Sequence, residues 1–273
     1  MNEPSPSRRA AVEDRLPPNR RPFRRGAAIL PSLFTTGNLF LGFWAIVKAF
    51  DGQAVEAAPL IGLAIVLDML DGRIARLTGT TSEFGAALDS LADAISFGVA
   101  PALLAYRWAL DEVPRLGWLT AFLFALCGVL RLARFNVQKH STDMRFFVGL
   151  PIPAAAGQLA AVIAFAPARV TGWVHGLFSL LLVAVLALLM VSTLRYRSFK
   201  GVDLRVRRSY LAVLGIALVF MFIAAHLEYS LLAIASLYTL SAPSSYLFGL
   251  AFRRRGAPPN SPVLGSETPG AAP

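Results

Sequence analysis

Charged residues are scarce in this sequence, and their scarcity limits the kind of protein it encodes. Only 15% of the 273 residues are Asp, Glu, Lys or Arg, whereas soluble domains average about 25%. Hydrophobic residues make up 56% of the chain, and its mean hydropathy is +0.59. This composition excludes an ordinary soluble domain and predicts an integral membrane protein.

Cysteine and histidine are also in short supply. Cys127 is the only cysteine, which excludes an intramolecular disulfide, and it lies in an apolar run where a neutral thiol packs as a small hydrophobic group. The three histidines, His140, His175 and His226, are far apart, and no pair has the spacing of metal ligands. We therefore assign no chemistry to either residue type.

Acidic residues are outnumbered by basic ones, 16 to 26, which gives a formal net charge of +10. In a soluble protein such a balance would raise the question of nucleic-acid binding. Here the basic residues stand between apolar runs, and no motif that reads RNA or DNA is present. We attribute the charge to membrane topology and to contact with anionic membrane lipids, and we expect no nucleic-acid partner.

Long apolar runs dominate the chain between two polar tails. Each run approaches the ~20 residues with which a helix crosses the hydrocarbon core. Lipid offers backbone groups no hydrogen-bond partners, so such runs must be helical. The eight runs cover residues 33–50, 58–76, 85–107, 117–135, 150–166, 173–194, 210–226 and 229–250. The sequence therefore predicts an all-α, polytopic membrane helix bundle of about eight transmembrane helices.

The basic residues also orient the chain. With the N-terminus in the cytoplasm, most Lys and Arg residues, including the clusters within 195–208 and 253–255, fall on the cytoplasmic side, as the positive-inside rule requires. We expect a multi-pass protein of the inner cell membrane with both termini cytoplasmic. The expected divisions are a disordered tail at 1–28, a membrane core at 29–195, a basic loop with two further helices at 196–252, and a disordered tail at 253–273.

Four aspartates stand out inside the second and third apolar runs. Asp68 and Asp71 are three residues apart, and Asp89 and Asp93 are four apart, spacings that place both members of a pair on one helical face. The polar stretch between the two pairs is typical of a turn, so the two helices are expected to run antiparallel. The four carboxylates would then converge near the cytoplasmic surface, where we place the active site.

Four acids in one membrane site repel one another unless cations neutralise them. Hard oxygen ligands in this number suit Mg²⁺, Mn²⁺ or Ca²⁺ rather than zinc. We expect two divalent cations, Mg²⁺ or Mn²⁺, in an arrangement suited to phosphoryl transfer. The alternative is that the acids form salt bridges with Arg73 and Arg76, but two arginines cannot balance four carboxylates. Gly72, Ala75 and Gly85 would leave room for a ligand, and Arg76 has the charge and shape to bind phosphate.

The aspartates belong to the pattern D-x2-D-G-x2-A-R-x8-G-x3-D-x3-D, which runs from Asp68 to Asp93. This segment resembles the signature of the CDP-alcohol phosphotransferase family and departs from it nowhere. The resemblance implies six core membrane helices, here followed by two more, a dimetal site and a homodimer. It also implies that Asp68, Asp71, Asp89 and Asp93 bind metal, that Asp93 acts as the catalytic base, and that Gly72, Ala75, Arg76 and Gly85 line the site for the CDP group.

Three flanking stretches bear on the acceptor alcohol. They read P-x3-T-x2-N-x3-G at 31–42, R-L-A-R-F-N at 131–136 and F-x-G-L-P-x-P-A-A-A at 147–156, and together they resemble the membrane-type phosphatidylserine synthases. The resemblance implies CDP-diacylglycerol as donor and L-serine as acceptor, with phosphatidylserine and CMP as products. We expect direct displacement, because no serine or cysteine nucleophile with an adjacent base is visible.

Further polar residues in these stretches are candidate substrate ligands. Thr35 and Asn38 are expected to reach the cytidine or a phosphate, unless they serve as a helix cap or an interhelical hydrogen bond. Arg131, Arg134 and Asn136 are expected to bind the acceptor, because a guanidinium grips a carboxylate with two hydrogen bonds. The alternative for the two arginines is that they anchor a helix end at the membrane surface.

Other functions remain open at this stage. Within the same family the acceptor could be glycerol 3-phosphate or an inositol phosphate, whose extra phosphate would meet Arg131, Arg134 and Lys139. An ion-coupled transporter would also keep acids inside the membrane. A non-catalytic membrane scaffold would tolerate the loss of these acids.

Overall fold

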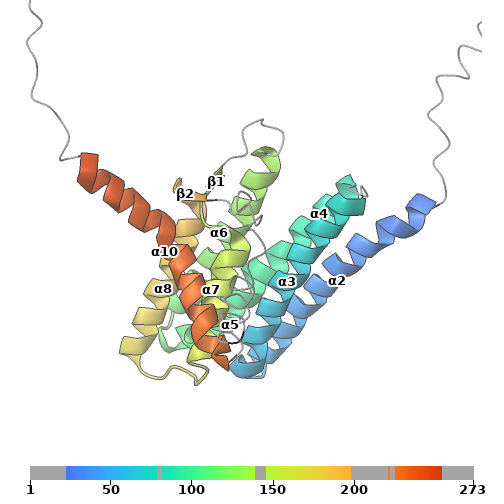
Figure 1. Ribbon diagram of the computed structural model, residues 1–273. Helices are drawn as coiled ribbons and strands as arrows, with labels where there is room; N and C mark the ends of the chain where they lie inside the picture. The colour runs from blue at the N-terminus through green and yellow to red at the C-terminus, as the bar shows by residue number, and fades with distance from the viewer. Residues whose placement is uncertain (1–22, 79–81, 139–145, 198–220, 222–224, 254–273) are drawn as a thin grey trace, which may run out of the picture.

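The computed structural model describes residues 23–78, 82–138, 146–197, 221 and 225–253, and its elements are almost all helical (Figure 1). The helices are α2 (Phe23–Phe50), α3 (Ala54–Thr78), α4 (Glu83–Asp93), α5 (Ala100–Trp108), α6 (Leu116–Gln138), α7 (Ile152–Phe165), α8 (Trp173–Val191) and α10 (Leu227–Arg253). A π-helical segment, Ala94–Val99, joins α4 to α5, and a 3₁₀ turn, Leu110–Glu112, follows α5. The strands β1 (Phe146–Val148) and β2 (Arg195–Arg197) complete the described elements.

The helices coincide with the predicted spans wherever the structure describes them, with α4 and α5 forming the third span. Most of the predicted span 210–226, and most of the predicted tails at 1–28 and 253–273, lie outside the described residues. Four described stretches are long and apolar enough to cross a membrane, namely Ser32–Phe50, Glu83–Trp108, Leu116–Gln138 and Trp173–Val191. The prediction of a polytopic helical membrane protein is thus confirmed, while the number of eight crossings stays a prediction.

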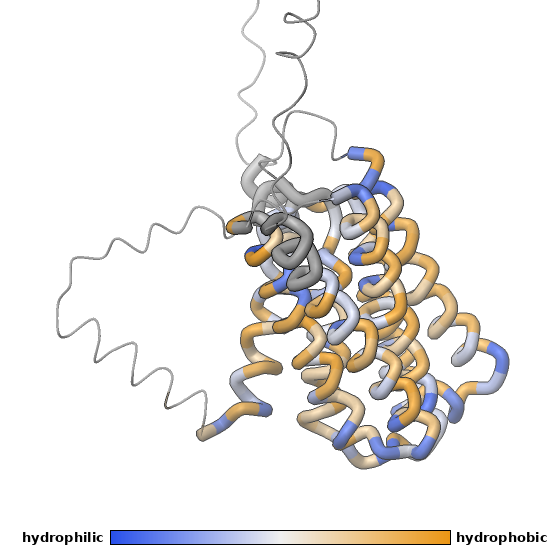
Figure 2. Tube along the Cα trace, turned by 90° about the vertical axis from the view of Figure 1, so that its right-hand side faces the viewer, coloured by the Kyte–Doolittle hydropathy of each residue, from blue (hydrophilic) through white to orange (hydrophobic). Residues whose placement is uncertain are grey.

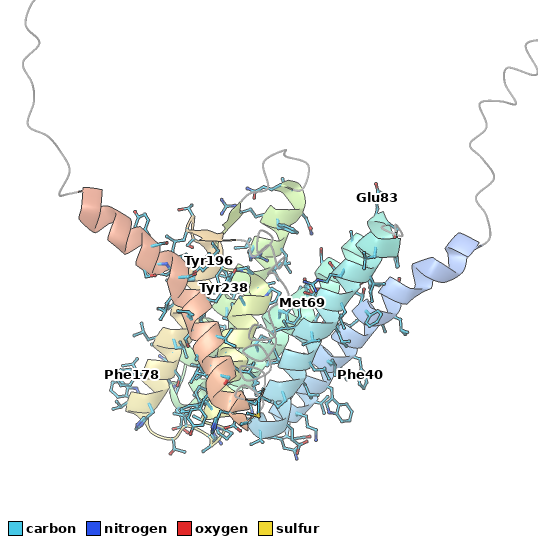
Figure 3. All side chains as sticks on the ribbon, in the orientation of Figure 1. Phe40, Met69, Glu83, Phe178, Tyr196 and Tyr238 are labelled. Atoms are coloured by element: carbon cyan, nitrogen blue, oxygen red, sulfur yellow. The ribbon has the colours of Figure 1, made fainter. Side chains whose placement is uncertain are left out.

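The residues along the helices are mostly hydrophobic, and hydrophilic residues gather toward the ends of the bundle (Figure 2). Large hydrophobic side chains point away from the bundle, as Phe40 on α2 and Phe178 on α8 illustrate (Figure 3). Their exposed fractions are 58% and 69%. Contiguous exposure of large apolar groups marks a membrane-facing surface, in agreement with the scarcity of charge in the sequence.

Small residues allow close packing inside the bundle. α2 packs along α3, α7 contacts both α3 and α10, and α6 packs against α8. Ala45 of α2 and Ala57 and Ala64 of α3 are completely buried. Such residues let the backbones of membrane helices approach closely, where van der Waals contact holds them together.

The π-helical segment that follows Asp93 is pressed against α2. Gly42 of α2 has no room for a side chain, because a Cβ there would collide with the backbone and side chain of Ser96. The Ser96 hydroxyl donates a hydrogen bond of 3.0 Å to the backbone carbonyl of Asn38. π-Helical turns within α-helices are frequent at functional sites, and this one fixes the chain after Asp93 against α2.

A short antiparallel pair of strands, β1 and β2, departs from the predicted all-helical architecture. Gly149 directly follows β1 with a φ of +85°, and a Cβ there would run into the carbonyl of Met190. Its backbone N–H donates to the carbonyl of Leu194 at 2.8 Å, and Leu150 donates to Leu189 at 2.9 Å. The glycine of the F-x-G-L-P stretch therefore forms a tight turn against the end of α8, which hydropathy alone does not reveal.

α2 begins and α10 ends at the same end of the bundle, where β1 and β2 also lie (Figure 1). α10 begins at the opposite end, where its Tyr229 packs edge-to-face on Phe165 of α7 with ring centroids 5.3 Å apart. The opposite end also carries a salt bridge between Arg169 and Asp111, 2.6 Å long. We call the end with the two strands the site end, because α3 ends and α4 begins there.

Candidate functional site

Three aspartates from two helices converge in the half of the bundle toward the site end. α3 and α4 run in opposite directions, and α2 packs against both (Figure 1). Carboxylate oxygens of Asp68 on α3 and of Asp89 and Asp93 on α4 all lie within 4.8 Å of one another. The structure thus brings together three of the four aspartates that the sequence predicted as metal ligands.

The fourth aspartate, Asp71, lies one turn further along α3 and close enough to Asp68 to interact with it electrostatically. Asp71 is 6% exposed, and the hydroxyl of Thr35 on α2 donates a hydrogen bond to its Oδ2. A buried carboxylate needs such a donor, because it has lost the water that would otherwise solvate it. Its role as a metal ligand remains a prediction.

Asn38 makes the matching contact to the other helix. Its side-chain amide donates to Oδ1 of Asp93 at 3.3 Å, and both residues are buried. Thr35 and Asn38 lie three residues apart on α2, so one face of this helix holds one aspartate from α3 and one from α4. This is the interhelical hydrogen bonding that the sequence left as the alternative to direct contact with cytidine or phosphate.

The candidate CDP ligands lie on the two helices that carry the aspartates. Gly72 and Ala75 are partly buried on α3, and Arg76 lies in the last turn of this helix with its side chain outside the described atoms. Gly85 is in the first turn of α4, where its backbone N–H donates to the hydroxyl of the N-cap residue Ser82 at 3.0 Å. All four residues therefore lie toward the site end, beside or beyond the aspartates.

The three candidate acceptor ligands differ in burial and in the groups that they contact. Arg131 of α6 is partly buried and lies within electrostatic range of Asp93, whereas Arg134 is exposed. The side-chain amide of Asn136 donates to the hydroxyl of Ser90 at 3.0 Å. Asn136 therefore links α6 to the residue that follows Asp89, a contact that no spacing in the sequence predicted.

The charges of the cluster suit bound cations. Three carboxylates within 4.8 Å of one another repel each other strongly when ionised. The guanidinium of Arg131 interacts with one of them, Asp93, and a single positive charge cannot balance three negative ones. Carboxylate oxygens are hard ligands of the kind that Mg²⁺ and Mn²⁺ prefer. The residues present therefore fit a divalent metal site.

Three relatives show what this chain is similar to. A CDP-diacylglycerol–serine O-phosphatidyltransferase of Helicobacter pylori is 41% identical over 195 residues, which cover 71% of this chain and 82% of the relative. The enzyme of the same name from Mycobacterium tuberculosis is 39% identical over 203 residues, covering 71% of each chain. An archaetidylserine synthase of Methanothermobacter thermautotrophicus is 38% identical over 174 residues, covering 63% of this chain and 71% of the relative.

The family model that matches this chain spans most of it. The match runs from residue 28 to residue 242, from α2 into α10, and so includes every aspartate described above. It agrees with the resemblance that the pattern from Asp68 to Asp93 carries. The chain belongs to the CDP-alcohol phosphatidyltransferase family, whose members use divalent metal ions.

Proposed function

We propose that this protein transfers the phosphatidyl group of CDP-diacylglycerol to L-serine, giving phosphatidylserine and CMP. The observation that carries the proposal is the convergence of Asp68, Asp89 and Asp93 within 4.8 Å inside a membrane helix bundle. The names of the relatives at about 40% identity support the donor and the acceptor. The protein is therefore a CDP-diacylglycerol–serine O-phosphatidyltransferase.

Asp68, Asp89 and Asp93, with Asp71 beside them, would hold two divalent cations, Mg²⁺ or Mn²⁺. Such ions, when bound, offset the negative charge of the pyrophosphate and of the departing CMP. Gly72, Ala75, Arg76 and Gly85 line the CDP side of the site. Arg76 adds charge-assisted hydrogen bonds to a phosphate, and the small residues leave space for the nucleotide to approach the helices.

Asp93 is the base of the reaction. It accepts the proton of the serine hydroxyl, and the serine oxygen attacks the phosphorus that carries diacylglycerol. The bond from this phosphorus to the bridging oxygen of the pyrophosphate breaks, and CMP leaves. Asn38 holds Oδ1 of Asp93 by its hydrogen bond and so orients the carboxylate toward the acceptor.

The site end faces the cytoplasm, and the protein acts as a homodimer in the inner cell membrane. The positive-inside distribution of Lys and Arg supports this orientation, and L-serine and CMP are water-soluble molecules of the cytoplasm. Thr35 and Asn38 act on the substrates through the aspartates that they hold. The family resemblance of the segment from Asp68 to Asp93 supports the dimer.

The acceptor is tested with the purified wild-type protein in detergent micelles that contain CDP-diacylglycerol and Mn²⁺ or Mg²⁺. CMP release is measured with L-serine, glycerol 3-phosphate, an inositol phosphate or no acceptor. We expect release that depends on L-serine and on the metal. Release with a phosphorylated acceptor alone would keep the family chemistry but refute serine as the substrate. If the protein released no CMP but carried ions across proteoliposome membranes, and this flux required the site aspartates, a transporter would be favoured instead.

A further inference from the structure

Arg131 carries a guanidinium at the edge of the aspartate cluster. Its Nε is buried and has no hydrogen-bond partner among the described residues, while the group lies 6.0 Å from the centre of the Phe135 ring. A buried N–H without an acceptor is costly. An acceptor atom supplied by a ligand would remove that cost, so Arg131 is arranged to receive an anionic group.

Tyr238 of α10 lies within electrostatic range of the same guanidinium. The guanidinium therefore interacts with two groups, the carboxylate of Asp93 and the phenol of Tyr238. In Figure 3, Tyr238 lies on the inner side of α10 next to Tyr196 of β2. No motif in the sequence marks Tyr238, because α10 is separated from the other site helices by a long stretch of chain.

The position of Tyr238 is fixed by a buried set of contacts. The rings of Tyr196 and Tyr238 have centroids 5.6 Å apart, and the Tyr196 hydroxyl donates to the backbone carbonyl of Thr239 at 3.2 Å. Gln158 of α7 donates to the hydroxyl of Ser236 at 3.2 Å. Burial, with a smaller contribution from Tyr238, raises the pKa of Tyr196 to about 12, so this phenol stays protonated as a donor.

The other two acceptor candidates lack these features. Arg134 is exposed on α6, and Asn136 is exposed and already bonded to Ser90. Arg131 therefore remains the one predicted acceptor ligand that combines burial, an unsatisfied donor and proximity to Asp93 within the described part of the chain.

We infer that Arg131 and Tyr238 form the subsite for the α-carboxylate of the acceptor amino acid, with Tyr196 as a positioning residue for Tyr238. The inference rests on the proposed function and goes beyond it by assigning acceptor selection to α6 and α10. The hydroxyl and the carboxylate of serine are close neighbours in one small molecule, so the cation that binds the carboxylate must lie near the base. Arg131 meets this requirement with a two-pronged donor, and Tyr238 adds a single hydroxyl donor.

Selectivity follows from the same donors. A site built to bond a charged substrate group discriminates strongly against an analogue without it, because its buried polar groups are then left unpaired. An amino alcohol whose carboxyl group is blocked therefore leaves the buried Nε of Arg131 without an acceptor. The preference for serine over such an analogue arises from the contact between the serine carboxylate and the subsite. It should be lost when the carboxylate is blocked or when the subsite residue is replaced.

The test pairs a change in the protein with a change in the acceptor. CMP release is measured for wild type, Tyr238→Phe, Arg131→Lys and the control Tyr246→Phe, each with L-serine and with L-serine methyl ester. Tyr246 lies eight residues further along the same helix and is 58% exposed, so it is a tyrosine of α10 outside the proposed subsite. We expect Tyr238→Phe to lower kcat/KM for serine about tenfold, mainly through the serine KM, as loss of one hydrogen bond to a charged group predicts.

Tyr238→Phe should leave kcat/KM for the methyl ester, and the KM for CDP-diacylglycerol, within about twofold of wild type. Tyr246→Phe should leave kcat/KM within about twofold of wild type for both serine and its methyl ester. Arg131→Lys keeps the charge but loses the fork, so we expect it to lower the preference for serine over its ester as well. Equal losses with serine and ester would assign Tyr238 a structural role and overturn the inference. A wild-type protein that releases no CMP with serine would instead refute the proposed function itself.

Discussion

At the scale of single residues, the site depends on two donors of α2 as much as on the aspartates. Thr35 donates to Asp71 on α3, and Asn38 donates to Asp93 on α4. Burial removes the water that would solvate each carboxylate, and a hydrogen bond to the charged group replaces part of that solvation. The two side chains thus keep the carboxylates ready to bind cations in a largely apolar bundle.

Replacing Thr35 by valine tests this role with little change in shape. Thr35→Val removes the donor to Asp71, and we expect CMP release at limiting Mn²⁺ to fall roughly 10- to 100-fold, the usual effect of losing a residue that orients a metal ligand. Thr36→Val is the matched control, because Thr36 is exposed and its hydroxyl bonds to Ser32 of its own helix. A Mn²⁺ titration of both variants gives the measurement, and equal behaviour of the two would contradict the role of Thr35.

At the scale of elements, the contact between α2 and the π-helical segment aligns the residues of the site. Gly42 lets α2 lie directly on Ser96, and the Ser96 hydroxyl bonds to the carbonyl of Asn38. Asn38 in turn holds Asp93. A change in the spacing between α2 and the π-helical segment would therefore move the base relative to its donor.

An alanine at Gly42 should separate these two elements. The added Cβ would collide with the backbone of Ser96, and we expect Gly42→Ala to destabilise the fold by about 1–3 kcal/mol, as overpacking does in well-packed cores. At Gly62 of α3 a Cβ meets nothing within 4 Å, so Gly62→Ala should leave stability unchanged or raise it slightly. Thermal unfolding in detergent compares the two variants. A Gly42→Ala protein as stable as wild type would show that the contact is not tight.

The sequence predicts local features of these elements well and distant contacts poorly. The spacing of Asp89 and Asp93 predicts that both lie on one face of α4, because helical periodicity is a local property. The polar stretch between α3 and α4 predicts the antiparallel arrangement that brings Asp68 to them. The turn at Gly149 and the approach of Tyr238 to Arg131 depend on which helices pack together, and one sequence carries no record of that. The three-residue strands are likewise a consequence of how the ends of α6, α7 and α8 meet.

At the scale of the whole molecule, the two ends of the bundle differ in chemistry. The site end holds the aspartate cluster and Arg131, whereas the opposite end holds salt bridges of Lys48 with Glu56 and of Arg169 with Asp111. Between the ends the helices consist mainly of hydrophobic residues (Figure 2), and many of their large apolar side chains are exposed. A bundle with this surface lies across a membrane with each end in a different compartment.

Single cysteines at the two ends test the orientation. Cys127 is the only native cysteine and is 5% exposed, so Cys127→Ala supplies a background without thiols. Glu83→Cys places an exposed thiol at the site end (Figure 3). Asp51→Cys places one in the exposed turn that follows α2 at the other end. In intact spheroplasts an impermeant maleimide should label Asp51→Cys at once and Glu83→Cys only after permeabilisation. The reverse order would place the site outside the cytoplasm.

The measurement that tests the central claim most directly is serine-dependent CMP release by wild type, Asp93→Asn and Asp51→Asn in the same detergent with Mn²⁺. Both substitutions remove one carboxylate with little change in size, but Asp93 belongs to the three-aspartate cluster and Asp51 lies exposed at the opposite end. The account predicts a loss of at least about a hundredfold for Asp93→Asn, as expected for a general base, and wild-type release for Asp51→Asn. Release by Asp93→Asn within about twofold of wild type would contradict the assignment of the cluster as the catalytic centre.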